Sequence, residues 1–487
     1  MNSLLTAKIR IFRGIVFLLL CSSPCAAAGS PTERPAVEGR TGWPVEEYPR
    51  DFRLSAVTGP VLSDTLPGET HPDSIPYSAD PSLGRQLLKA PSALLHLAVL
   101  PLKWGMIWSR EHQLYSRVSD FFLNEEGTAG FYPNFSVGGR TPFAAGITYF
   151  NRDLLEGGHS LDLNTFYTDP ENYKLGINYK IPPTQLRRYQ VTVNGNLRSN
   201  DDQNIFLGGN KGSDDQQGTY EIEQYNLETQ AGYLLRRNVL ATVIGGLIHT
   251  DIRDLSAAAG DGGPAGEPAA AGAFSPGNAT LFNTGLGVIV DNRRGLFENR
   301  NTSLISTVTT SYDFKQTKIR VYSGALYDVG IRYNRSLTGD EVEYLNYYGD
   351  WQQFFAIPGL PPDRRLAFRV RLHKRYPLSG GSVPFYEQSI LGDADNLRGY
   401  RQDRFRDLGS LLLTLEYRYP IWDTWDAVLF TDQGQVFNTY DQIGLDRFHG
   451  SVGTGLRFMT ASDFLFRLEI AFSKEGSRSL LEFSMNF

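Results

Sequence analysis

The stretch "FLFRLEIAFS", residues 464–473, alternates between two kinds of side chain. Successive side chains of a β-strand point to opposite faces of the sheet. One face of this strand would be apolar throughout, with Phe464, Phe466, Leu468, Ile470 and Phe472. The other would carry both charges, with Leu465, Arg467, Glu469, Ala471 and Ser473. A membrane barrel turns the apolar face to lipid and the charged face to its lumen, whereas a soluble β-sandwich buries the apolar face.

The same two-residue period runs from about residue 127 to the end of the sequence. In "LAFRVRLHKRY", residues 366–376, apolar positions alternate with a basic row of Arg369, Arg371, His373 and Arg375. In "LLTLEYRYP", residues 412–420, apolar positions alternate with Thr414, Glu416 and Arg418. We predict sixteen strands, at residues 130–138, 143–152, 158–168, 172–181, 187–199, 218–236, 238–251, 279–291, 300–314, 341–357, 364–377, 408–420, 425–438, 449–460, 463–474 and 477–487.

An even number of strands places both ends of a barrel on the periplasmic side, so the connections from odd to even strands are the outer loops. Most of these are the longer connections, at residues 200–217, 252–278, 315–340 and 378–407. The connections from even to odd strands, such as 182–186 and 358–363, are expected to be short.

The composition allows either two or three soluble domains or one large membrane barrel, with 41% apolar and 21% charged residues. The net charge of -6 argues against a nucleic-acid partner. The sequence ends in "LLEFSMNF", which has an aromatic last residue and an apolar face that includes Phe483, Met485 and Phe487. Such a terminal strand is typical of outer-membrane barrels. The sequence therefore predicts an all-β fold, a transmembrane antiparallel barrel over residues 128–487.

The N-terminal segment has the features of a secretory signal peptide over residues 1–28. Basic residues precede an apolar run at 14–20, and Ala26 and Ala28 form an A-x-A site before Gly29. Both cysteines of the sequence, Cys21 and Cys25, lie in this segment, and neither has a lipoprotein context. We expect export, no lipid anchor, and no disulfide or thiolate metal site after processing.

Two further segments precede the predicted barrel. Residues 29–81 are rich in proline and have no apolar period, which predicts a disordered arm. Residues 82–127 have the pattern of a short amphipathic helical segment. Because His96, Pro101 and Lys103 interrupt its most apolar window, two interfacial or barrel-plugging helices are favoured over one spanning helix.

The connection between the eleventh and twelfth predicted strands contains "GDADNLRGYRQDRFRDLG", residues 392–409, with four charges of each sign. On composition alone this is a solvated external loop. The inward charges of the neighbouring strands favour a loop that folds into the lumen, where its charges find partners.

Four sets of residues resemble the BamA/TamA-like superfamily of outer-membrane assembly and two-partner secretion barrels. The first is "LRGY", which matches the family's inward-folded sixth loop and comprises Leu397, Arg398, Gly399 and Tyr400. The second is "FTDQG", similar to the family's F-x-D-x-G strand, with Phe430, Asp432 and Gly434. The third is "DNRRGLFENRNTSL" from Asp291, which looks like a turn leading into a strand. The fourth pairs "IFLGGN" at 205–210 with "GTGLRF" at 453–458.

This resemblance implies that Arg398 reaches across the lumen to Asp432. A guanidinium enclosed in a narrow polar tube needs a fixed carboxylate partner, and the loss of either one leaves an uncompensated charge. Gly399 would allow a tight turn at the loop tip, and Tyr400 would pack on the wall. Family members usually carry periplasmic POTRA modules, and no such module is expected here.

Three functions are open. The first is assistance in inserting or translocating proteins, or lipid, at the outer membrane, through a weak seam between the first strand, which contains Pro133, and the last. Partners would then be outer-membrane lipid, client outer-membrane or secreted proteins, and the barrel assembly machinery for the protein's own insertion. The second is a passive pore in which the basic row sets an anion preference. An enzyme is the least favoured, because seven scattered histidines form no catalytic motif. No cofactor or metal is expected.

Overall fold

The computed structural model describes Phe122, Asn124 and residues 128–485, with gaps at 138–142, 155–158, 183–187, 207, 213–216, 237, 257–276, 296–320, 339–341, 358–363, 379–380, 422–424 and 460–463. The predicted signal peptide, proline-rich arm and helical segment, and the expected lack of POTRA modules, lie outside the described residues. Within the described part of the chain, no helix has the length and apolar character needed to cross a membrane.

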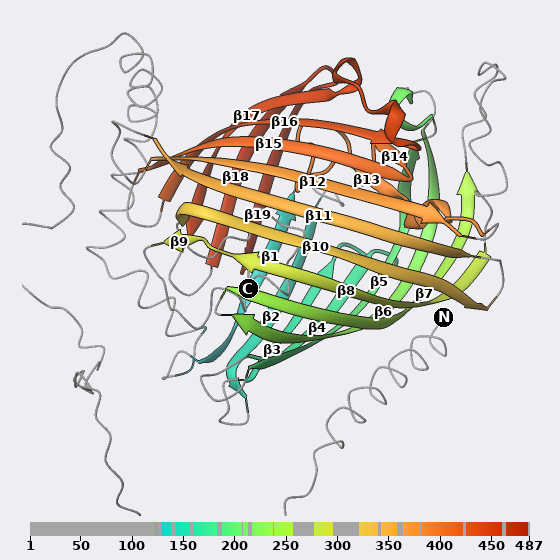
Figure 1. Ribbon diagram of the computed structural model, residues 1–487, viewed down its shortest axis with the longest axis horizontal. Helices are drawn as coiled ribbons and strands as arrows, with labels where there is room; N and C mark the ends of the chain where they lie inside the picture. The colour runs from blue at the N-terminus through green and yellow to red at the C-terminus, as the bar shows by residue number, and fades with distance from the viewer. Residues whose placement is uncertain are drawn as a thin grey trace, which may run out of the picture. The chain divides into compact units, whose positions relative to one another are not determined.

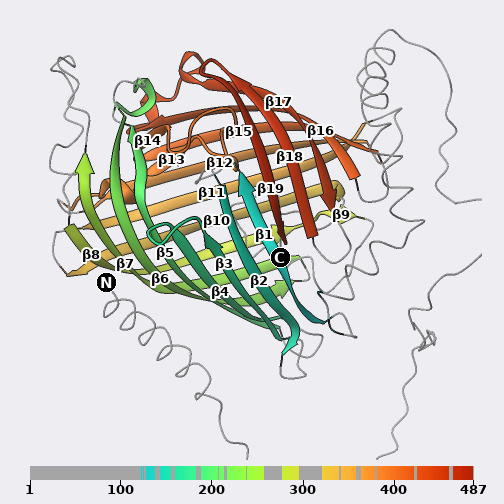
Figure 2. The same ribbon diagram turned by 180° about the vertical axis from the view of Figure 1, so that it is seen from behind.

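Sixteen long antiparallel strands form the barrel, as the sequence predicts (Figures 1 and 2). They are β1 (Ala129–Val137), β2 (Phe143–Leu154), β3 (His159–Tyr167), β4 (Tyr173–Ile181), β5 (Tyr189–Phe206), β6 (Gln217–Arg236), β7 (Val239–Ser256), β8 (Gly277–Asp291), β10 (Val321–Thr338), β11 (Glu343–Ala356), β12 (Arg365–Pro377), β15 (Gly409–Pro420), β16 (Trp425–Phe437), β17 (His449–Met459), β18 (Phe464–Ser473) and β19 (Gly476–Met485). Each pairs with the next in the chain, and β1 pairs with β19.

The burial pattern of β18 confirms the two faces that the sequence predicts for it. Leu468, Ile470 and Phe472 are 39 to 51% exposed, whereas Arg467 and Glu469 are at most 1% exposed. The apolar side chains therefore face outward, and the charged ones are enclosed. In a soluble sandwich the opposite would hold, so this inversion identifies a transmembrane barrel.

One predicted loop is wrong. Residues 315–340 were expected to form an outer loop, but 321–338 form β10, which pairs with β8 and β11. Outward Tyr327 and Val329 alternate with buried Asp328, so the two-residue period is present, although glycines and charges obscure it. The strand predicted at 300–314 lies outside the described residues.

The position of β10 in the sequence also changes the lengths of the connections on either side of it. The even-to-odd connection from β8 to β10 spans residues 292–320 and contains the two-residue strand β9 (Arg294–Gly295), so it is not short as expected. The next odd-to-even connection, between β10 and β11, is only 339–342. The 378–408 connection between β12 and β15 keeps its predicted length and contains the loop that builds the site.

Strand length varies around the barrel. The strands β5, β6, β7 and β10 have 18 to 20 residues each. The strands near the β1–β19 junction, which are β1 to β4 and β17 to β19, have 9 to 12 residues. The wall is therefore tallest opposite this junction and shortest beside it.

Candidate functional site

The 378–408 loop folds into the barrel and is attached at its base by apolar packing. Its two arms pair as β13 (Ser389–Leu391) and β14 (Phe405–Asp407), preceded by the short 3-10 helix η3 (Phe385–Glu387). Phe385 is fully buried in a cluster with Ile205, Tyr220, Ile222 and Ile252 of β5 to β7. Val383 packs in a second cluster with Ala279, Leu281, Val342 and Tyr344. These contacts fix the loop base to the inner wall around β5 to β8 and β11.

The loop tip places Arg398 against Asp432 of β16. Its Nε donates to Oδ2 of Asp432 at 2.7 Å and its Nη2 donates to Oδ1 at 2.8 Å, while its backbone N–H donates to Oδ2 at 3.2 Å. Arg398 is 1% exposed and Asp432 is fully buried. The contact that the family resemblance implies is thus bidentate, which is the strong geometry for a guanidinium and a carboxylate.

Arg398 has further partners that the sequence did not single out for it. Its Nη1 donates to Oε1 of Glu416 at 3.0 Å and to Oε2 of Glu469 at 3.3 Å. The centroid of the Phe430 ring lies 3.4 Å from its Cζ, a cation–π contact. Burial lowers the pKa of the Arg398 guanidinium, but Asp432 and Glu469 raise it by more, so the pKa lies well above its ordinary value. The loop tip therefore carries a permanent positive charge.

Two arginines of the wall complete the arrangement. Arg457 donates to Oε1 of Glu416 at 2.8 Å and to Oε1 of Glu469 at 2.7 Å. Arg418 donates to Oε2 of Glu416 at 2.9 and 3.0 Å. We call the set the charge cluster, and its members are Arg398, Arg418, Arg457, Glu416, Asp432 and Glu469. Three positive and three negative groups cancel, and every carboxylate is hydrogen-bonded, which are the conditions under which buried ion pairs are tolerated.

Two glycines make room for the loop tip. Gly399 has a φ of +94°, which favours glycine, and a Cβ there would lie 3.1 Å from Cβ of Ser451. Oγ of Ser473 donates to the Gly399 carbonyl at 2.7 Å. At Gly434, a Cβ would lie 3.0 Å from Leu391. The tip therefore lies directly against β16 to β18.

The other residues of the motif pack on the wall. Leu397 and Tyr400 are at most 2% exposed in an apolar cluster with Leu391, Phe405, Leu412 and Val436. The Tyr400 hydroxyl donates to the Gly450 carbonyl at 3.2 Å. Burial raises the pKa of this hydroxyl, so it stays protonated as the donor.

The returning arm of the loop contacts the opposite part of the wall as well as the turn between β18 and β19. Asp403 accepts a hydrogen bond from Gln203 of β5. Arg404 donates from Nη2 to the Gly212 carbonyl at 2.8 Å, and its Nε lies 2.8 Å from Oε1 of Glu475. Arg401, by contrast, is exposed. The loop thus spans the lumen, from β15–β18 at its tip to β5–β8 at its base, and its returning arm contacts both sides.

The basic row on β12 is engaged with neighbouring groups. Nε of Arg369 donates to Oδ1 of Asp350 at 2.9 Å, and Nε of Arg371 lies 3.9 Å from Oδ2 of the same residue. Arg375 donates to Oγ of Ser389 in the loop at 2.7 Å. The His373 ring stacks near Tyr348, with centroids 6.4 Å apart. Asp350 offsets part of the positive charge of this row.

Among the described residues, the junction between β1 and β19 is the shortest pairing between neighbouring strands of the sixteen. The part of the chain that the structure describes has three pairs in register there, with Val137 opposite Leu481, Ser136 opposite Glu482 and Phe135 opposite Phe483. β1 has nine pairs with β2, and β19 has ten with β18. Phe483 and Met485 lie in β19, while Phe487 lies outside the described residues. We call this junction the seam.

No group of three or more His, Cys, Asp or Glu side chains among the described residues could hold a metal ion. The geometry offers instead an enclosed, neutral charge cluster, a loop that spans the lumen, and a short seam. These features define a transmembrane barrel with a lumenal loop anchored by charge.

Comparison of the sequence with known protein families identifies the family of this barrel. A model of the Omp85 superfamily domain matches residues 153–486, so the chain belongs to the Omp85 superfamily. No curated protein matches the chain. Similar solved structures include BamA from Haemophilus ducreyi lacking POTRA domains 1–3, with 14% identity over 73% of this chain and 70% of that chain and a TM-score of 0.49.

Two CdiB barrels are also similar. CdiB from Acinetobacter baumannii shares 14% identity over 72% of this chain, with a TM-score of 0.47, and CdiB from Escherichia coli shares 11% over 73%, with a TM-score of 0.44. This chain spans 59% and 62% of the length of these two proteins.

Proposed function

We propose that this barrel inserts or translocates polypeptide chains at the outer membrane of a Gram-negative-type bacterium, by opening at the seam. The three-pair pairing of β1 with β19 is the observation that carries the proposal. A backbone hydrogen bond contributes about 0.5–1.5 kcal/mol net. A pairing of three residues therefore holds β1 and β19 together only weakly. Pro133 of β1, which has no N–H to donate, lies outside these three pairs and is in register with Ile147 of β2.

The short strands beside the seam support the same function. A transmembrane strand needs about 9–11 residues, and strands of this minimum length flank the seam. A short apolar wall is accommodated by thinning of the bilayer. A client chain that leaves the seam would then meet thinner hydrocarbon than elsewhere around the barrel.

Membership of the Omp85 superfamily and the resemblance to assembly barrels support this function. The partners we propose are outer-membrane lipid, client outer-membrane or secreted proteins, and the barrel assembly machinery that inserts this protein itself. We place both termini in the periplasm, and we propose no enzymatic activity.

A disulfide across the seam tests the proposal. Val137→Cys and Leu481→Cys, made in a chain with Cys21→Ser and Cys25→Ser, are in register and would lock β1 to β19. In liposomes, the locked protein should lose its ability to accelerate the folding of a second barrel protein, and reduction should restore it. A matched lock at Leu429→Cys and Thr454→Cys, also in register but between β16 and β17, should have no effect. Full activity of the seam-locked protein would exclude opening at this site.

An anion-preferring pore is the alternative. The ion pair between Arg369 and Asp350, and the loop across the lumen, disfavour a wide basic channel. Planar bilayer recordings separate the two functions. Large, steady, anion-selective currents would support the pore, and small, erratic currents would support a barrel closed by its loop.

A further inference from the structure

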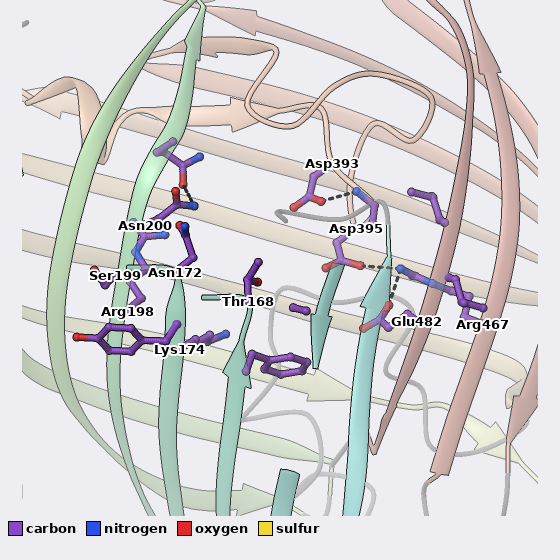
Figure 3. Close-up of a pocket in the computed structure, with 17 residues that line it drawn as sticks. Thr168, Asn172, Lys174, Arg198, Ser199, Asn200, Asp393, Asp395, Arg467 and Glu482 are labelled. Carbon is purple, nitrogen blue, oxygen red and sulfur yellow. Dashed lines mark hydrogen bonds and ion pairs between the residues drawn. The ribbon is translucent and has the colours of Figure 1, made fainter. Parts of the chain in front are cut away.

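The last strand of the barrel and the tip of the loop meet at one arginine. Arg467 of β18 has a side chain that is 1% exposed, and its Nη2 lies 2.6 Å from Oε2 of Glu482 and 3.2 Å from Oδ1 of Asp395. Glu482 belongs to β19 and is in register with Arg467 on one side and with Ser136 of β1 on the other. Asp395 lies in the loop tip, close before Arg398. Figure 3 shows Arg467 between the two carboxylates.

These residues line a cavity of about 410 Å³. The loop tip and β18–β19 form one side of the cavity, and inward residues of β2 to β5, including Lys174 and Arg198, form the other (Figure 3). The side chains of Asp395 and Glu482 are 45% and 29% exposed, whereas that of Arg467 is buried. The arginine is therefore fixed in the wall, and its two partners border open space into which they can move.

We propose that Arg467 is a positioning residue that couples the loop tip to the state of the seam. The same nitrogen of its guanidinium serves both carboxylates, so the orientation that Glu482 imposes is the one that binds Asp395. When β19 is paired with β1, the pairing fixes the position of Glu482, and Glu482 orients the Arg467 guanidinium toward Asp395 of the loop. When the seam opens, β19 and Glu482 shift, and the loop tip loses one of its attachments. This inference rests on the seam opening of the proposed function.

Labelling of the loop tip, with and without a locked seam, tests the coupling. Ala394→Cys places a thiol at the cavity, in a full chain with Cys21→Ser and Cys25→Ser. Phe135→Cys and Phe483→Cys, oxidised to a disulfide, lock the seam, and alanines at both positions give the unlocked reference. In liposomes, the lock should slow iodoacetamide labelling of the tip by about fivefold or more when Arg467 is present.

The Arg467→Gln variant should reduce this effect of the lock to less than about twofold. Asp395→Asn, at a loop position whose side chain is 45% exposed, should do the same, while Arg467→Lys should restore part of the effect. Arg401→Gln, at an exposed arginine of the same loop, is the matched control and should leave the effect unchanged.

An equal effect of the lock with and without Arg467 would overturn the coupling, as would a lock that does not change labelling in the chain with Arg467. The assay contains no client protein. A barrel that shows the coupling but does not insert proteins would therefore refute the proposed function and leave this inference intact.

Discussion

Replacing Arg398 by alanine should release the loop tip from the wall. The substitution removes both side-chain hydrogen bonds to the Asp432 carboxylate, the contacts to Glu416 and Glu469, and the charge over the Phe430 ring. It leaves the charge cluster with three carboxylates and two arginines, so one buried negative charge is no longer offset. Breaking a buried ion pair by removing one partner costs about 3–5 kcal/mol.

That cost sets the size of the expected effect. Each 1.4 kcal/mol changes an equilibrium about tenfold, so the ratio of released to docked loop should rise by roughly a hundredfold to a few thousandfold. Arg401→Ala is the control, because Arg401 is exposed and makes one hydrogen bond, to Gln217 at 3.1 Å. An exposed contact of this kind contributes about 0–1 kcal/mol. Arg404 would be a poor control, because it is 4% exposed and bound to Glu475.

Limited trypsin cleavage of the folded barrel measures this release, because the loop carries its own arginines beyond position 398. Arg398→Ala should be cut in the loop much faster than the unaltered chain, while heat-modifiable mobility on a gel reports that the barrel is folded. Adding Asp432→Ala should cost less than the sum of the single changes, because the remaining cluster is again neutral. Equal cleavage of Arg398→Ala and Arg401→Ala would refute this account of the loop tip.

Three further changes have expected outcomes. Gly399→Ala should weaken loop docking by about 1–3 kcal/mol through its positive φ and the close wall, seen as faster loop cleavage. Gly245→Ala on β7, where an added Cβ has nothing within 4 Å, should leave cleavage unchanged. Asp350→Ala should increase anion preference in bilayer recordings, because it removes the negative charge beside Arg369 and Arg371. Tyr400→Phe keeps the ring packing and loses one hydrogen bond, so it should lower the thermal unfolding free energy by only about 0.5–1.5 kcal/mol.

The barrel could be predicted because its main signal is local. The ten residues of "FLFRLEIAFS" are enough to show the two-residue period, and the inward direction of Arg467 and Glu469 follows from it. β10 was missed because Gly324 and Gly330 and several charges obscure the same period in its sequence. Where a strand is both glycine-rich and charged, it resembles a loop in composition.

The partners within the site could be predicted only in part. The contact between Arg398 and Asp432 joins two recognisable motifs, so the family resemblance supplies it. Arg457 donates a hydrogen bond to Glu416, which is 41 residues away in the sequence, and Gln203 donates one to Asp403, which is 200 residues away. Which inward charges meet across a lumen depends on the curvature and stagger of the barrel, and no local pattern in the sequence encodes these.

The positions of the two loop anchors indicate which part of the wall moves when the seam opens. The base holds β5 to β8, the tip holds β15 to β18, and the returning arm contacts both, so the loop ties these two sectors together. The cavity separates the tip from β2 to β4. We therefore expect β1 to β4 to swing outward while the remainder of the barrel keeps its shape.

Distances between spin labels can test this expectation. Labels on the lipid-facing residues Leu163 of β3 and Ile470 of β18 should give a broad distribution that a seam disulfide narrows. Labels on Val243 of β7 and Leu415 of β15, which also face outward, should give a narrow distribution with or without the disulfide, because the loop joins their sectors. Broadening of the second pair alone would place the movement on the other side of the barrel and contradict the role assigned to the loop.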